Sequence, residues 1–397
     1  MKKFLVLSVG IALLAATLPL MAQAPASGHV MSPPVRVANV PQTPAKPTGL
    51  LPRQVRAAYG FNQIGNLGAG VTIALVDAYD DPNIASDLAF YANYFGFTPC
   101  NFTKVKLGTV QGQGWDLEES LDVQQACALA PQANIVLVEA VSNEGSDLYA
   151  AVQVATQPPY NADVVSMSWG GGEYSTETDD DQTYFCNITN GNGHPVTFFA
   201  SSGDGGHGVG YPAASHCVIA VGGTELTLST ATPLPNPLEL DYGHETAWSG
   251  SSGGVSQFEP QQSWQNPACA EWSTSNRCVP DISSVAFNIP VYDTYSFSGW
   301  VSVEGTSISS PDWASFVALV NSERLKNGGT TVSQLAQDLY NLYYNSGNYA
   351  NDFHDIATGN NGSCGSQCQA ITGYDLVTGI GTLQAQHLIT PLVADTN

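Results

Sequence analysis

The sequence predicts an α/β fold in which a parallel β-sheet is covered by helices on both faces. Short, continuously apolar segments alternate along the chain with longer segments whose apolar residues recur at helical spacing. Continuous apolar strands are typical of parallel sheets, because helices bury both of their faces. The chain has 397 residues, of which 43% are hydrophobic, so it is long enough to build a large core.

The first predicted unit is a strand at residues 70–77, which ends at Asp77, followed by a helix at residues 83–95. We interpret Asp77 as a cap of the loop that follows the strand. The alternation continues with helices at 116–130 and 147–156 and with strands at 134–140, 163–168, 195–200 and 217–222. Ligands of such sheets bind beyond the carboxyl ends of the strands, so we expect the functional site in the loops there.

Two further regions have a distinct composition. Residues 227–300 are rich in Gly, Ser, Pro and Trp and are expected to form long surface loops and hairpins. Residues 1–24 begin with two lysines, continue as an apolar stretch and reach small residues at positions 22–24, which is typical of a secretory signal peptide. Residues 25–45 are expected to be an extended linker, and residues 46–397 a single folded domain.

The chain is strongly acidic, with 11 Lys and Arg residues against 34 Asp and Glu residues and a net charge of −23 at pH 7. This charge argues against nucleic acid and an anionic membrane surface as partners. An exported chain with eight cysteines is expected to form disulfides. Many connectivities are open, and we favour sequential pairing: Cys100–Cys127, Cys186–Cys217, Cys269–Cys278 and Cys364–Cys368.

The most informative stretch is Glu-Gly-Thr-Ser-Ile-Ser-Ser-Pro at residues 304–311, which precedes an apolar, helix-compatible run. A Gly-Thr turn that places a serine at the start of a helix exposes its hydroxyl and directs backbone N–H groups at an oxyanion formed beside it. Ser307 is therefore the candidate nucleophile. An ordinary helix N-cap would explain the same residues, so the hypothesis depends on a base that takes the proton of the serine.

Histidine is the usual base, but none of the seven histidines lies in a His-Gly-Thr context on a helix early in the chain. Glu118 and Asp122 are better candidates, because residues four apart share one face of a helix. Two adjacent carboxyls disfavour double ionisation and can share a proton, so the pair can act as a base in acid, where histidine is protonated. The alternative is a solvated acidic helix face.

Four motifs, in this order, resemble those of the sedolisins, which are serine-carboxyl peptidases with a subtilisin-like fold. They are Glu118-x-x-x-Asp122, Ser168-Trp169-Gly170, Ser202-Gly203-Asp204 and Gly305-Thr306-Ser307-x-x-x-Pro311. Each motif alone is weak, and the subtilisins share the last one. The resemblance extends from about residue 51 to the C-terminus.

The resemblance implies that Ser307 attacks the scissile carbonyl, that Glu118 takes the proton of Ser307, and that Asp122 orients Glu118 and shares a proton with it. Asp204 would be the oxyanion-hole group, a role that requires a protonated carboxyl. By its residues alone, Asp204 is also explained by an ordinary Gly-Asp-Gly turn. The strand end Ser168-Trp169-Gly170 would pair with the extended backbone of the substrate.

Two segments near the C-terminus, 353–359 and 371–375, offer the carboxylates and carbonyls that Ca²⁺ prefers. The resemblance implies a calcium site formed by the side chains of Asp355 and Asp375 and the carbonyls of Ile356, Ile371 and Gly373. Acidic turns without a metal are the alternative.

Two features depart from the pattern of the family. Glu304 stands where many relatives have a small residue before Gly-Thr-Ser, so we expect an altered pocket or proton network. Sedolisins usually carry a large prosegment, whereas only about 20 residues separate the predicted signal peptide from the predicted domain. The sequence therefore does not explain how latency would be kept.

The leading hypothesis is a secreted, extracellular or periplasmic endopeptidase that acts in acid on proteins or peptides through an acyl-enzyme, with Ca²⁺ as its cofactor. We expect it to be a monomer without a membrane or nucleic-acid partner. A glycosidase that used Glu118 and Asp122 would need these carboxyls on different elements, on either side of a sugar. A non-catalytic secreted binding protein on the same fold and a subtilisin-type serine peptidase are the remaining alternatives.

Overall fold

The structure is a computed structural model that describes residues 28–39, 46–230, 240–345, 347 and 349–395. The predicted signal peptide lies outside these residues. Within them, the central feature is an eight-stranded sheet, in agreement with the predicted α/β class. Its strands follow the order β10 (Tyr242–Ala247), β9 (Ile219–Leu228), β7 (Thr197–Ser201), β5 (Val164–Met167), β2 (Thr72–Ala78), β4 (Asn134–Ala140) and β3 (Asn101–Lys106), and β13 (Ile282–Val285) also pairs with β9.

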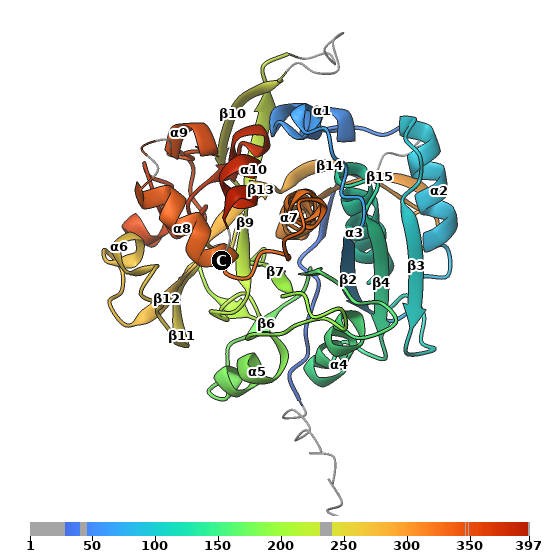
Figure 1. The fold of residues 1–397 in the computed structure, drawn as a ribbon, viewed down its shortest axis with the longest axis horizontal. Helices are drawn as coiled ribbons and strands as arrows, with labels where there is room; N and C mark the ends of the chain where they lie inside the picture. The colour runs from blue at the N-terminus through green and yellow to red at the C-terminus, as the bar shows by residue number, and fades with distance from the viewer. Residues whose placement is uncertain (1–27, 40–45, 231–239, 346, 348, 396–397) are drawn as a thin grey trace, which may run out of the picture.

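The sheet is mostly parallel and is covered on both faces, because side chains along each strand alternate between two cores. In β2, Ile73 and Leu75 face the core that contains α7 (Thr306–Lys326) and α3 (Asp116–Leu129). Ala74 and Val76 face the second core, with α4 (Gly145–Thr156). Figure 1 views α7 along its axis at the centre of the molecule, with α3 beside it.

A second, three-stranded sheet has the order β1 (Arg36–Asn39), β15 (Gly299–Glu304) and β14 (Phe287–Asp293), with antiparallel pairing throughout. Strand β15 leads directly into α7 through Gly305. The prediction of long surface loops and hairpins for residues 227–300 is confirmed for the hairpin formed by β14 and β15, which pair antiparallel. It is wrong for β13, which is fully buried in the main sheet. Composition missed this strand because its burial is imposed by distant segments.

The remaining elements pack around the two sheets and their helices. They are α1 (Pro52–Ala58), α2 (Ile84–Phe95), β6 (Gly171–Gly172), α5 (Glu177–Tyr184), β8 (Gly210–Tyr211), β11 (Gly254–Pro260), α6 (Asn266–Cys269), β12 (Asn276–Val279), α8 (Leu335–Asn345), α9 (Tyr349–Asp352), β16 (Phe353–His354), β17 (Thr382–Leu383) and α10 (Ala385–Ala394), with short 3₁₀ turns at Phe61–Gln63 and Gly365–Cys368. In the described part of the chain, no helix is both long and apolar enough to cross a membrane.

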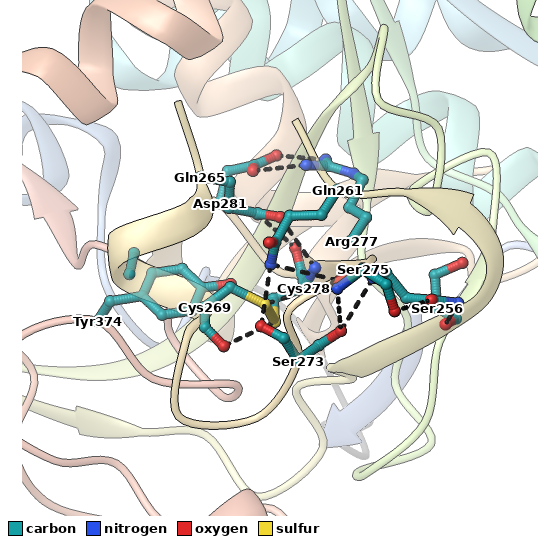
Figure 2. The surroundings of a disulfide bond; sticks show 12 residues. Ser256, Gln261, Gln265, Cys269, Ser273, Ser275, Arg277, Cys278, Asp281 and Tyr374 are labelled. Carbon is teal, nitrogen blue, oxygen red and sulfur yellow. Dashed lines mark hydrogen bonds and ion pairs between the residues drawn. A yellow bond between two sulfur atoms is a disulfide. The ribbon is translucent and has the colours of Figure 1, made fainter. Parts of the chain in front are cut away.

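All four disulfides join the cysteines in sequential pairs, as predicted. Figure 2 shows the Cys269–Cys278 bond, which ties α6 to β12. Beside it, the buried guanidinium of Arg277 donates to both carboxylate oxygens of Asp281, at 2.9 and 2.6 Å, and to the carbonyl oxygens of Ala214 and Val218. The bonds to the two carbonyl oxygens tie β12 to the segment that leads into β9, and the bidentate pair with Asp281 holds the guanidinium in place.

Candidate active site

The turn between β15 and α7 places Ser307 at the second position of the helix. Gly305 has φ +149°, a conformation that side chains disfavour, and a Cβ atom there would lie 2.7 Å from Asp204 Oδ2 and 3.1 Å from the carbonyl oxygen of Pro34. Pro311, four residues after Ser307, has no N–H to donate to the Ser307 carbonyl. The Oγ atom of Ser168 lies 3.4 Å from that carbonyl oxygen instead.

Every residue of α3 is buried, so the interpretation of its acidic residues as a solvated face is wrong. Glu118 and Asp122 have no exposed surface. Burial raises the pKa of both carboxyls well above their usual values, and the charge of Asp77 raises them further. The Ser168 hydroxyl donates a 2.8 Å hydrogen bond to Asp122 Oδ1, which opposes the shift at Asp122 and fixes the orientation of its carboxyl.

Ser307 and Glu118 are neighbours across the α3–α7 contact. The Ser307 hydroxyl and the Glu118 oxygens make no hydrogen bond of normal geometry here, yet the hydroxyl lies close enough to lower the pKa of Glu118 against the effect of burial. Such contacts are commonly loose before a substrate tightens them. The described interactions of Ser307, Glu118 and Asp122 include no histidine.

Asp77 does not cap a loop, contrary to our interpretation of the sequence. It lies within β2, is fully buried, and neither of its carboxyl oxygens has a hydrogen-bond partner. Burial, together with the charge of Glu139, raises its pKa to about 8. Asp77, Glu118 and Asp122 therefore form one group of buried carboxyls that cannot all be ionised together, so protons are shared among them. The sequence signal was a carboxylate at the end of a continuously apolar strand.

Asp204 uses its two carboxyl oxygens differently. Oδ1 accepts hydrogen bonds from the Thr306 N–H at 2.8 Å and the Thr306 hydroxyl at 3.0 Å, whereas Oδ2 is buried and has no partner. Burial raises the pKa of Asp204 to about 8, although both Thr306 bonds oppose this shift. A proton on this carboxyl therefore belongs on Oδ2, where it can be donated to a substrate oxygen.

The N-terminal segment, residues 28–39, belongs to the stretch that the sequence predicted to be an extended linker. It is extended, but it lies in the cleft beside these carboxyls. Ser32 and Gly170 exchange two backbone hydrogen bonds, of 3.0 and 3.2 Å, and Arg36 pairs with Glu304 on β15. Figure 1 shows the segment in blue, rising from the lower side of the fold toward β15. The cleft beside it has a cavity of about 480 Å³ lined by residues 32–36, 170–172 and 201–211.

This segment places one peptide bond at the centre of the site. The carbonyl oxygen of Pro34 borders the same side of Gly305 as Asp204 Oδ2. The N–H of Val35, the next residue, lies close enough to Glu118 to lower the pKa of that carboxyl. The Pro34–Val35 amide therefore has its oxygen near the oxyanion candidate and its nitrogen near the base candidate.

The three predicted substrate-binding residues have different surroundings. The backbone of Gly170 pairs with Ser32, and the side chain of Ser168 contacts Asp122. Trp169 is fully buried, and its Nε1–H donates to the Val76 carbonyl at 2.7 Å, so its side chain anchors the strand end to β2.

The five residues of the predicted calcium site lie close together near the C-terminus. Asp355 Oδ1 accepts from the Gly373 N–H at 3.0 Å, and Asp375 Oδ2 accepts from the Ile371 N–H at 3.0 Å. Asp375 has no exposed surface and no ion pair within the described residues, and its Oδ1 also accepts from the Val377 and Thr378 N–H groups at 2.8 Å. Burial raises its pKa to about 7, so a hard divalent cation at these two carboxyls would take the place of a proton.

Comparison with known proteins agrees with this geometry. Residues 117–377 match the subtilase family. Kumamolisin from Bacillus sp. (strain MN-32) is 30% identical over 369 residues, which cover 85% of this chain and 62% of kumamolisin. Physarolisin from Physarum polycephalum is 28% identical over 84% of this chain and 66% of its own length. Sedolisin from Pseudomonas sp. (strain 101) is 26% identical, with 81% and 57% covered. The match thus spans less than two thirds of each relative.

A solved structure shows the same fold. Pseudomonas sedolisin, described as a serine-carboxyl proteinase complexed with two molecules of pseudo-iodotyrostatin, superposes with a TM-score of 0.72 at 24% identity. The alignment covers 89% of this chain and all of that one.

Proposed function

The chain belongs to the subtilase family, and we propose that it is a serine-carboxyl peptidase of the sedolisin type that hydrolyses proteins or peptides in acid. The observation that carries the proposal is the position of the Pro34–Val35 amide between Asp204 and Glu118. A peptide bond held in this way has a proton donor beside its oxygen and a carboxyl beside its nitrogen.

The proposed reaction uses these groups in turn. Glu118 takes the proton of Ser307 as its oxygen attacks the carbonyl carbon, and Asp204, protonated at Oδ2, donates to the developing oxyanion. Glu118 then returns the proton to the leaving amine, which occupies the place of the Val35 N–H. Asp122, held by Ser168, and Asp77 keep the carboxyl group of Glu118 in a shared-proton network. Hydrolysis of the resulting ester restores Ser307.

The proposal also covers the secretion of the protein and a calcium site. Residues 1–24 would direct secretion, and residues 46–397 would form the peptidase domain. Asp355, Asp375 and the carbonyls of Ile356, Ile371 and Gly373 would hold Ca²⁺, whose charge would stabilise the C-terminal loops. A subtilisin-type triad is less well supported, because no histidine is among the described partners of Ser307.

Covalent labelling tests the proposal. At acid pH, a peptide aldehyde directed at serine should add its mass to the wild-type chain and not to Ser307→Ala. Ser309→Ala is the matched control, because Ser309 lies on the same helix but bonds to the carbonyls of Ser284 and Val285. Labelling of folded Ser307→Ala, or no labelling and no hydrolysis of an unfolded protein by the folded wild type, would overturn the proposal.

A further inference from the structure

The N-terminal segment defines the register of an extended peptide in the cleft. Ser32 pairs with Gly170, and the Pro34 carbonyl faces the oxyanion candidate two residues later. If Pro34–Val35 occupies the place of the scissile bond, Val35 is the first residue on its leaving-group side and Arg36 is the second. Arg36 is also the first residue of β1.

The residues on the leaving-group side of the Pro34–Val35 bond form a β-strand. β1 is antiparallel to β15, with Arg36 opposite Glu304 and Val37 opposite Val303. Because β15 continues through Gly305 into α7, an added strand is fixed in register with Ser307 by the backbone alone. Glu304 therefore faces whichever residue occupies the position of Arg36.

The surroundings of this position are acidic. The Arg36 guanidinium donates a hydrogen bond to the backbone carbonyl of Asp204. Directly opposite residues of antiparallel strands have Cβ atoms about 4.5–5.5 Å apart, so the Glu304 carboxylate and a basic side chain at position 36 lie on one face of the ribbon. Within the described residues, no ion pair neutralises Glu304: the guanidinium of Arg36 bonds to the Asp204 carbonyl instead, so the Glu304 carboxylate acts on this position through its charge and not through a contact. Its charge is thus available to a bound peptide.

Resting on the proposed function, we propose that the cleft selects a basic residue at the second position after the scissile bond, through the Glu304 carboxylate and the Asp204 carbonyl. The carboxylate supplies charge, and the carbonyl accepts a hydrogen bond that a small or acidic side chain cannot donate. This assigns a role to Glu304, the residue that departs from the sedolisin pattern. Glu304 is a specificity residue here and takes no part in the chemical step.

Paired peptides test the proposal at pH 5. The two substrates differ only at the second position after the cleaved bond, which carries arginine or its neutral isostere citrulline. For the wild type, kcat/KM should be about two- to fivefold higher with arginine, the size of a partly exposed ion pair. In Glu304→Gln the ratio should fall to about one. The ratio is the readout, because the charge of Glu304 also raises the pKa of Asp204, so that its loss changes the rates on both peptides together.

Glu225→Gln is the matched control, because the Glu225 carboxyl is near enough to Glu304 for its pKa to be raised by that charge, yet it lies on β9 outside the pairing edge. It should keep the wild-type ratio. Equal wild-type rates on both peptides would overturn this inference and leave the peptidase proposal intact, as would an unchanged ratio in Glu304→Gln. If the folded wild type hydrolysed neither peptide nor an unfolded protein, the proposed function would fail, and this inference with it.

Discussion

The backbone N–H of Thr306 donates a 2.8 Å hydrogen bond to Asp204 Oδ1, and Oδ2 of the same carboxyl is left buried without a partner. Thr306 directly precedes Ser307, so the residue that positions the nucleophile also orients the oxyanion candidate. The bond leaves Oδ2 as the atom that carries the proton. The pH dependence of activity follows from this arrangement.

We expect activity to be greatest in acid, roughly at pH 3–5, and to fall toward alkaline pH. With the N-terminal segment in place, burial raises the pKa of Asp204 to about 8. Displacement of the segment by water lowers this pKa, so the donor proton is present in acid and is lost as the pH rises toward 8. Initial rates on an unfolded protein from pH 2 to 9 check this, and a maximum at or above neutral pH would contradict the mechanism.

Asp204→Asn separates the pH dependence of the oxyanion donor from that of the catalytic base. An amide donates a hydrogen bond at every pH, so this variant should keep some activity and show a weaker alkaline fall. A histidine base would instead gain activity as the pH rises through about 6.5. An alkaline limb identical in Asp204→Asn and wild type would show that Asp204 is not the group that titrates.

Ser168→Ala should lower kcat with little change in KM. The described hydrogen bonds of the Ser168 side chain go to Asp122 and to the Ser307 carbonyl, so loss of its hydroxyl frees the Asp122 carboxyl to rotate. A hydrogen bond to a charged group contributes about 1.5–3 kcal/mol, which corresponds to roughly 10- to 100-fold in rate. Ser168→Thr, which keeps the hydroxyl, should recover part of the loss; equal effects of both variants would point to packing instead.

Thermal stability should fall as the pH rises from about 4 to 8. A buried carboxyl whose folded pKa is raised stabilises the fold when protonated, so its contribution is complete below the unfolded pKa and is lost as the pH rises through the folded pKa. For Asp77 this window runs from about 4 to about 8. Each such group changes the free energy of unfolding by at most about 1.4 kcal/mol per pH unit.

Asp77→Asn should flatten this slope, because the amide does not ionise. Melting curves recorded in a Ser307→Ala background avoid self-digestion. A melting temperature that rose or stayed constant from pH 4 to 8 in the parent would contradict the burial of protonated carboxyls.

Calcium should raise the melting temperature by binding the native state alone. At a calcium concentration 100 times the dissociation constant, the stabilisation is about 2.7 kcal/mol. Chelation should lower the melting temperature, and Asp375→Ala and Asp355→Asn should each reduce the response. Asp352→Asn, on the preceding helix α9, is the control and should respond as wild type. Identical curves with and without chelator would remove the metal site.

The wild-type chain should cleave its own N-terminal segment in acid. The Pro34–Val35 amide lies where the substrate bond is expected, so incubation at pH 4 should yield chains that begin at Val35. Ser307→Ala should retain the bond. N-terminal sequencing of both proteins decides this, and the same N-terminus in both would show that the segment is bound without being cut.

Local patterns predicted much of this protein. Continuous apolar strands alternating with helices predicted the parallel sheet, because a strand that is buried on both faces consists of consecutive apolar residues. The four-residue spacing of Glu118 and Asp122 was enough to place them on one face of a helix. The assumption that each cysteine pairs with the next one along the chain predicted the four disulfides. The sheet, the carboxyl pair and the disulfides could be predicted because each depends on residues near one another in the sequence.

The tertiary structure decided the chemistry of the carboxyls. The acidic residues of α3 have the pattern of a solvated face, but packing against α7, α2 and β14 buries them, and burial raises their pKa values. Asp77 joins them from β2, and residues 32–36 reach the cleft from a stretch whose composition indicated only a linker. Desolvation and charge coupling depend on which distant segments surround a group, and that information appears only when the chain is folded.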